Sequence, residues 1–369
     1  MASMRSPIFW LGPCGETIRM TDREVDSGVS GIQLPLPLLD PPVSISGVPT
    51  RLLAPVIEPV PGGTTVWHYT DAAGAIGMMT EGRVRATSVL CLNDEAEFHY
   101  GEGLVHDLIE GILGNGQLEP YQEAHLVEVE SSLKSVLDRY PLFIFCASEA
   151  EDSLGQWRGY SADPGYSLGF SVQDLVVLDR HSPPRTLDPL PHLAPRWGRV
   201  LYEKNAQHQL LLRGLSYCAA AASRDDSNGS LATSEPPMPP TNASGAEDVY
   251  GGYRPENAAA TLMSLLVFCK HPSFADEQEV RLVATSPPDS RAVEFRQSRF
   301  GVTPFVSLGV PPPEAEGRVW TAPLCDPYLP DHVMIGPTPH REPAFHGASQ
   351  LLRRAGLDFD PTHSASPFR

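Results

Sequence analysis

One stretch, residues 274–284, constrains this chain more than any other, and it reads Phe-Ala-Asp-Glu-Gln-Glu-Val-Arg-Leu-Val-Ala. From Glu277 onward, apolar side chains alternate with charged or polar ones, which predicts a β-strand. Such a strand places Glu277, Glu279 and Arg281 on one face and the apolar side chains on the other. Neighbouring carboxylates repel each other unless a cation lies beside them, and Arg281 or a ligand could supply it. The alternative is a solvent-facing edge strand with a surface salt bridge.

The rest of the chain predicts an α+β fold with a mixed β-sheet and flanking helices. Residues 141–148 form a continuous apolar run, which predicts a central strand covered on both faces. Because strands and helices do not alternate regularly, a doubly wound sheet is disfavoured. Periodicity, caps and turn residues predict helices near 71–82, 94–112, 120–138, 204–222, 258–270 and 343–355, and further strands near 64–70, 83–87, 166–170, 199–202, 277–284, 292–296, 303–308 and 331–335.

The distribution of proline, which occurs 38 times, divides the chain into parts. Residues 1–62 combine Pro-rich pieces with weak periodicity, which predicts an extension with little structure of its own. A single domain is expected over 63–356. It is interrupted at 223–254 by a loop insertion rich in Ser, Asn, Asp, Gly and Pro. Residues 357–369 are expected to form a C-terminal tail.

The charge and the cysteines exclude several classes of protein. A formal net charge of -18 argues against a broad nucleic-acid surface, although a few local arginines could still hold a small anion. The six cysteines form no C-x-x-C pair, so neither a zinc ribbon nor a thioredoxin site is indicated. The chain contains neither a signal-peptide pattern nor an apolar run of bilayer length. We therefore expect a soluble, cytoplasmic protein with no membrane partner.

Common catalytic motifs give little support for other chemistries. Gly165-Tyr166-Ser167-Leu168-Gly169 matches G-x-S-x-G by letter, but a turn precedes it where a nucleophile elbow needs a strand. The histidines form no H-E-x-x-H pattern, so no metal ligands are predicted. Neither a P-loop nor G-x-G-x-x-G is present.

Two short constellations are candidate binding elements. His68-Tyr69-Thr70 ends a predicted strand, where an imidazole could bond ribose hydroxyls and a phenol ring could stack on a flat ligand. Trp157, Arg158 and Tyr160 follow each other closely and could line a pocket for a flat ring and an anion. Ordinary packing of a strand end and of a helix onto the sheet is the alternative in each case.

The order and spacing of several motifs resemble those of a bacterial domain family of unknown function, numbered twenty-nine seventy-one. The resemblance spans about 66–340 and implies no activity. The residues that carry it are His68-Tyr69-Thr70, Leu92-Asn93-Asp94 with Glu97, Ser148, Trp157-x-x-Tyr160, Gly169-Phe170, Lys270 with Phe274-x-x-Glu277-x-Glu279-x-Arg281, Thr303-Pro304-Phe305 and Ile335-Gly336-Pro337.

A weaker similarity is to ADP-ribosyltransferases, which place a histidine, a serine and an E-x-E pair in this order. The similarity implies a split mixed sheet with NAD, the substrate, in its cleft. Glu279 would then be the catalytic glutamate, and Glu277 would orient the acceptor. His68 would contact the ribose, with Thr70 beside it, and Ser148 would support the glutamate. The nicotinamide ring would stack on Tyr69 or Tyr160, beside Trp157.

The chemistry of these side chains is consistent with that similarity. Cleavage of the nicotinamide–ribose bond builds positive charge on the sugar, which a strand-held carboxylate can stabilise. Arg281 would keep Glu279 ionised by lowering its pKa. Arg83, Arg85 and Arg158 are candidates for the pyrophosphate.

The leading hypothesis is thus an NAD-consuming, ADP-ribosyltransferase-like enzyme that acts on an unidentified acceptor macromolecule, with the role of a toxin or a defence effector as one expectation. One alternative is a non-catalytic module that senses a nucleotide or a peptide. A weaker alternative is a metal-dependent nuclease or hydrolase that uses these carboxylates with Asp94 and Glu97.

Overall fold

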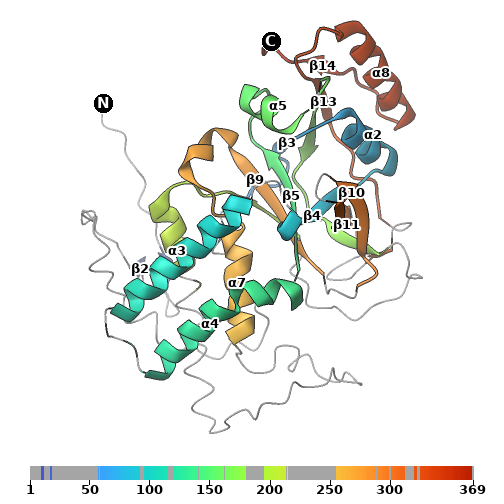
Figure 1. Ribbon diagram of the computed structural model, residues 1–369. Helices are drawn as coiled ribbons and strands as arrows, with labels where there is room; N and C mark the ends of the chain where they lie inside the picture. Colours follow the sequence, from blue (N-terminus) through green and yellow to red (C-terminus); the bar gives the residue numbers. More distant parts are fainter. Residues whose placement is uncertain are drawn as a thin grey trace, which may run out of the picture.

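The structure is a computed structural model, and its described residues form an α+β fold around one large mixed sheet (Figure 1). The N-terminal extension lies mostly outside the described residues, and so do Leu92-Asn93-Asp94 and the insertion at 223–254. The structure describes residues 10–11, 17–18, 57, 59–91, 95–114, 116, 118, 120–139, 141–161, 163–179, 195–212, 214, 255–286, 290–298, 301–311, 320–321 and 325–367.

The sheet confirms the predicted α+β class and mixed topology. Its main path runs β12-β7-β11-β4-β5-β3-β6-β13-β14, with β10 beside β11, β9 beside β5 and β8 beside β9. The pairs β7–β12 and β13–β14 are parallel, and the remaining pairs are antiparallel. β1 (Trp10–Leu11) and β2 (Thr17–Ile18) form a separate pair. The strands of the sheet are β3 (Thr65–Thr70), β4 (Val84–Ser88), β5 (Leu142–Ser148), β6 (Tyr166–Ser171), β7 (Val176–Asp179), β8 (Arg196–Arg199), β9 (Glu279–Thr285), β10 (Val293–Ser298), β11 (Gly301–Gly309), β12 (Trp320–Thr321), β13 (His332–Ile335) and β14 (Thr362–His363).

Helices cover both faces of the sheet, as the apolar run of β5 predicts. α3, α4 and α7 pack on the face that carries Ile144 and Val283. α2 and α8 pack on the opposite face, which carries Phe145 and Leu282. The helices include α2 (Ala72–Glu81), α3 (Glu95–Gly114), α4 (Pro120–Arg139), α5 (Leu154–Tyr160), α7 (Pro255–Leu266) and α8 (Arg341–Arg354), with 3-10 turns η2 (Val89–Cys91) and η3 (Pro272–Glu277). Residues 204–212 and 214, the described part of the helix predicted near 204–222, are helical as well.

The sheet divides at β5. One edge of β5 pairs with β9 along its whole length. On the other edge, the first part of β5 pairs with β4, whereas its last residue, Ser148, pairs with Trp67 of β3. β3 and β4 therefore share one edge of β5 and diverge beside Cys146, a place that we call the fork.

The imidazole of His68 occupies the fork. Its Nδ1 lies 2.7 Å from the carbonyl oxygen of Cys146. Because a carbonyl oxygen only accepts hydrogen bonds, the ring must donate from Nδ1. The side chain thus satisfies a backbone acceptor that neither neighbouring strand reaches.

Several predicted boundaries differ from the structure. The strand predicted at 199–202 is β8, which begins at Arg196 and ends at Arg199. The helix predicted to reach residue 270 ends at Leu266. Residues 362–363 of the predicted tail form β14, which pairs with β13. Within the described ranges, no helix has the length and apolar character needed to cross a bilayer.

Candidate functional site

The Glu-rich stretch differs from the prediction at its start. The strand β9 begins at Glu279, whereas Glu277 is the last residue of the 3-10 turn η3. Between them Gln278 has a left-handed backbone with φ of 44°, so the alternation of a strand cannot extend back to Glu277. β9 also pairs with β5 and β8 on its two edges, so the edge-strand alternative is wrong.

Glu277 and Glu279 nevertheless converge on one cation, Lys270. Its Nζ lies 2.7 Å from Glu277 Oε2, 3.0 Å from Glu279 Oε2 and 2.8 Å from Glu97 Oε1. Since an ammonium has three hydrogens, the three carboxylates use its whole donor capacity. The side chain of Lys270 is 2% exposed. The ammonium therefore holds together one residue from η3, one from β9 and one from α3.

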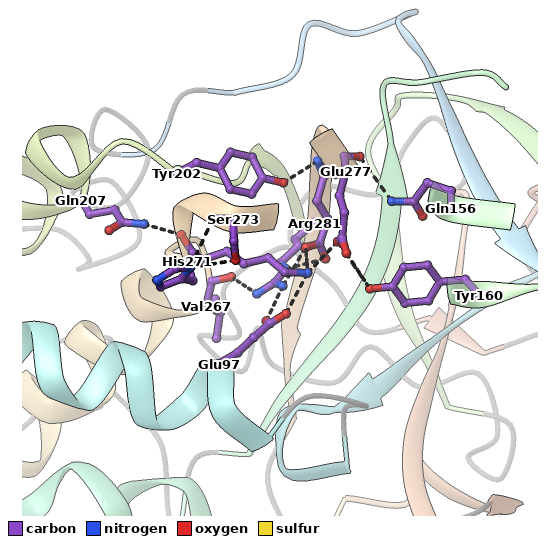
Figure 2. A network of polar contacts seen from close by, with 12 residues as sticks. Glu97, Gln156, Tyr160, Tyr202, Gln207, Val267, His271, Ser273, Glu277 and Arg281 are labelled. Carbon is purple, nitrogen blue, oxygen red and sulfur yellow. Dashed lines mark hydrogen bonds and ion pairs between the residues drawn. The ribbon is translucent and has the colours of Figure 1, made fainter. Parts of the chain in front are cut away.

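Arg281 is the second cation of this cluster, as the sequence predicted for the face it shares with Glu279. Its Nε and Nη2 lie 2.8 Å from the two carboxylate oxygens of Glu279, a bidentate pair. Nη2 also lies 2.7 Å from Glu97 Oε2, and Nη1 donates to the carbonyl oxygen of Val267 at 2.6 Å. We call Glu97, Lys270, Glu277, Glu279 and Arg281 the ion cluster (Figure 2).

The ion cluster sets the protonation states of its buried members. Burial by itself would raise the pKa of Glu279, but the charges and hydrogen bonds of Arg281 and the charge of Lys270 lower it to about 2. Burial opposes the charge on Lys270, yet Glu279 and Glu97 raise its pKa above the ordinary value. Both groups are therefore charged at neutral pH, and their opposite charges compensate the cost of burial.

Glu277 forms the outer side of the ion cluster. Its side chain is 20% exposed, against 7% for Glu279 and 16% for Glu97. The hydroxyl of Tyr160, a residue that is 40% exposed, lies 3.2 Å from Glu277 Oε1. Ser148 donates from its hydroxyl to the backbone carbonyl of Glu277 at 2.6 Å. Glu277, the most exposed carboxylate of the ion cluster, and the adjoining Tyr160 are thus the groups most open to a ligand.

Backbone contacts hold Lys270 in position. The side-chain amide of Gln207 donates to the carbonyl oxygens of Lys270 and Leu201, at 2.7 and 2.6 Å. Gln207 in turn accepts a hydrogen bond from the hydroxyl of Tyr100 at 2.8 Å. The backbone N–H of Glu279 donates to the hydroxyl of Tyr202 at 2.9 Å. These contacts fix the strand and the turn from which the charged side chains extend.

His68 is not part of the ion cluster. Its ring stacks on Phe145 at a centroid distance of 4.4 Å. Phe145 pairs with Leu282, whereas Ser148 pairs with Glu279, and alternation places these two pairs on opposite faces of the sheet. Burial lowers the pKa of His68 to about 4, so the ring is neutral at pH 7. The structure therefore does not place His68 and Glu279 across one pocket, as the sequence-based hypothesis required.

Four further predicted binding residues are placed as follows. Tyr69 and Trp157 are buried and pack edge to face at 4.7 Å, so neither offers a free face to a ligand. The Tyr69 hydroxyl donates to the carbonyl oxygen of Ala150 at 2.7 Å. Thr70 ends β3 and is half-buried, and Arg158 is exposed on α5. Of the predicted set, the structure brings together Glu277, Glu279, Arg281, Ser148 and Tyr160.

Sequence reasoning did not assign a site role to Lys270, and it named Glu97 only among the carboxylates of the metal-dependent alternative, although both residues occur in the motifs of the resemblance. For Lys270 a signal was available, because a single lysine directly follows the apolar run Val267-Phe268-Cys269. Burying that position requires a counter-charge. The two carboxylate oxygens of Glu97 bind the two cations of the cluster, Lys270 and Arg281.

Comparisons with known proteins agree with part of the resemblance. No protein of curated function and no solved structure gives a significant match to this chain. Residues 156–282 match the model of a family described as "Protein of unknown function (DUF2971)". The matched segment runs from α5 through β9, and it therefore contains Tyr160, Lys270, Glu277, Glu279 and Arg281. This chain is thus similar to a family without an assigned activity over a segment that contains four of the five residues of the ion cluster, all except Glu97.

Proposed function

We propose that this protein is an NAD-consuming enzyme of the ADP-ribosyltransferase or NAD glycohydrolase type, with its sugar-binding carboxylate at Glu277. One observation carries the proposal. Glu277 is the outermost carboxylate of a buried ion cluster, and it lies beside the half-exposed ring of Tyr160. This arrangement presents a fixed anion next to an aromatic surface, which suits a ribose that carries a flat base.

The charge of the cluster supports this assignment. It contains three carboxylates, on Glu97, Glu277 and Glu279, and two cations, on Lys270 and Arg281. The formal sum is one negative charge, and Glu277 is its most exposed member. In the reaction the C1′–N bond breaks and both electrons leave with neutral nicotinamide. Positive charge develops on the ribose, which an excess negative charge beside it would stabilise.

The remaining steps involve no oxidant or reductant. Water or an acceptor hydroxyl or amine attacks C1′, forms the new bond and releases one proton. Glu279 is bound by Arg281 and Lys270 through both oxygens, so we assign it a positioning role. The resemblance instead implied that Glu279 is the catalytic glutamate and that Glu277 orients the acceptor. Tyr160, whose hydroxyl contacts Glu277, would place one face of its ring against the nicotinamide.

The test compares matched glutamate-to-glutamine variants in an assay of nicotinamide release from NAD. We expect Glu277→Gln to reduce the rate about 100-fold, since a charge that acts on the transition state is removed. The control Glu110→Gln changes a 71% exposed side chain on α3 and should keep the wild-type rate. Thermal unfolding of each variant checks that the fold is retained. Equal rates for the wild type and Glu277→Gln, or no release by the wild type, would refute the assignment.

A non-catalytic binding module is the second candidate, and one observation favours it. Both oxygens of Glu279 and all three hydrogens of Lys270 are used within the ion cluster, so these groups are arranged for rigidity. A binding module predicts that NAD or ADP-ribose raises the midpoint of thermal unfolding while no nicotinamide is released.

A further inference from the structure

Two arginines outside the ion cluster, Arg85 and Arg296, lie over the ring of Phe305. Arg85 lies on β4, Arg296 on β10 and Phe305 on β11, between those two strands. The guanidinium carbons of Arg85 and Arg296 lie 5.3 and 5.9 Å from the centroid of the Phe305 ring. The pairing explains the convergence, because Phe305 is opposite Thr87 on one side and Glu294 on the other. Arg85 lies two residues from Thr87 on β4, and Arg296 lies two residues from Glu294 on β10. Both arginines therefore share the face of the sheet that carries Phe305.

The positive charge at this ring is only partly compensated. Arg85 forms an ion pair with Glu81 on α2. Among the described residues, no carboxylate forms an ion pair with Arg296, and its guanidinium donates to the hydroxyl of Thr87 at 2.8 Å. Burial and the charge of Arg85 lower the pKa of Arg296, while the smaller effect of Asp71 raises it. Two like charges therefore lie against one ring in a chain whose formal net charge is -18.

This pair also lies close to the fork. The charge of Arg296 contributes to lowering the pKa of His68, whose ring fills the fork. His68 binds the carbonyl oxygen of Cys146, and the thiol of Cys146 lies against Glu279. Along the sheet, β5 separates β4, which carries Arg85, from β9, whereas β11, β4 and β5 all lie between β9 and β10, which carries Arg296.

We propose that Arg85 and Arg296, together with the Phe305 ring, form a binding site for the pyrophosphate group of a nucleotide. The proposal rests on the proposed function in one respect, since it identifies the nucleotide as NAD. Guanidinium groups bind phosphate oxygens in a bidentate manner, and both groups lie against the same ring, at 5.3 and 5.9 Å from its centroid. A dianionic ligand between them removes the repulsion that the free protein retains.

The direct test uses inorganic pyrophosphate as the probe and isothermal titration calorimetry as the measurement. We expect Arg296→Gln to weaken binding about tenfold, as the loss of a hydrogen-bonded charge would. Arg296→Lys should keep part of the affinity, because the charge remains without the bidentate geometry. The control Arg353→Gln removes an exposed arginine from the last turn of α8 and should bind as the wild type does. Added salt should weaken the wild-type affinity.

The outcomes separate this site from the proposed function. Pyrophosphate binding that Arg296→Gln weakens, without release of nicotinamide from NAD by the wild type, supports the phosphate site and refutes the NAD assignment. Nicotinamide release by the wild type with an unchanged KM for NAD in Arg296→Gln overturns the phosphate site alone. Pyrophosphate binding that is absent from the wild type, or equal in Arg296→Gln, overturns it as well.

Discussion

The Nδ1 atom of His68 lies 2.7 Å from the carbonyl oxygen of Cys146, at the fork where β3 and β4 leave the same edge of β5. At this point the imidazole N–H donates the hydrogen bond that the backbone N–H of a neighbouring strand donates elsewhere in the sheet. The ring must be neutral to remain buried against Phe145. The stability of the sheet at the fork therefore depends on the protonation state of His68.

The first prediction concerns the pH dependence of stability. Burial lowers the pKa of His68 from 6.5 to about 4, so the folded state binds a proton less readily than the unfolded chain. The stabilisation is complete above pH 6.5 and is lost as the pH falls through that window towards 4. Between pH 7.5 and 4.5 we expect His68 to account for a loss of about 2 kcal/mol.

The measurement is the free energy of urea unfolding at several pH values for the wild type and for His68→Gln. The variant should be less stable at pH 7.5 but should show a flatter pH dependence. Glu279 does not interfere, because its folded pKa of about 2 affects stability only below about pH 4.5. Parallel pH profiles for the two proteins would contradict this account of His68.

The second prediction concerns Lys270. Lys270→Met leaves Glu97, Glu277 and Glu279 with Arg281 as their remaining cation in the cluster. Because uncompensated buried charges are costly, we expect a loss of about 3 to 5 kcal/mol in the free energy of unfolding. Adding Glu97→Gln to this variant should recover part of that loss, since it removes one of the repelling charges. Lys204→Met, at an exposed position, serves as the control and should change stability by less than about 0.5 kcal/mol.

The third prediction concerns the C-terminal segment. Asp152 accepts hydrogen bonds from Trp157 Nε1 at 2.6 Å, from the hydroxyl of Ser364 at 2.6 Å and from the backbone N–H of Ala365 at 2.8 Å. Asp152→Asn replaces one accepting oxygen by a donating nitrogen. We expect faster hydrogen exchange at Ala365 and a cost of about 1 to 3 kcal/mol for local opening. Asp358→Asn, in the same segment but exposed, should leave the exchange unchanged.

The fourth prediction concerns Gly336, which directly follows β13. A Cβ at this position would lie 2.8 and 2.9 Å from two ring atoms of Trp157. The ring is buried against Trp67, Tyr69 and Met334, so it cannot move away freely. We therefore expect Gly336→Ala to cost about 1 to 3 kcal/mol. Gly347→Ala, in α8 and without a contact within 4 Å, should instead stabilise the protein by up to about 1 kcal/mol. Thermal and denaturant unfolding of both variants provides the measurement.

The sequence by itself determined the elements that rest on local pattern. The apolar run 141–148 predicted the central strand β5, because burial on both faces favours apolar side chains at consecutive positions. Alternation in β9 correctly placed Glu279 and Arg281 on one face. The motif matching around Glu277 also agrees with the family model, which covers residues 156–282. In each case neighbours in sequence supply the decisive information.

Only the tertiary structure decided which charged groups meet. Gln278 takes a left-handed backbone that ends the strand period, and Glu277 still reaches Lys270 because η3 folds back towards it. Glu97 reaches the same ammonium from α3, which is remote in sequence. The fork likewise forms because β3 and β4 pair with different parts of one edge of β5. There His68 packs on Phe145, on the face of the sheet opposite the carboxylates. Periodicity describes the faces of single elements, but contacts between elements follow from the packing of the whole sheet.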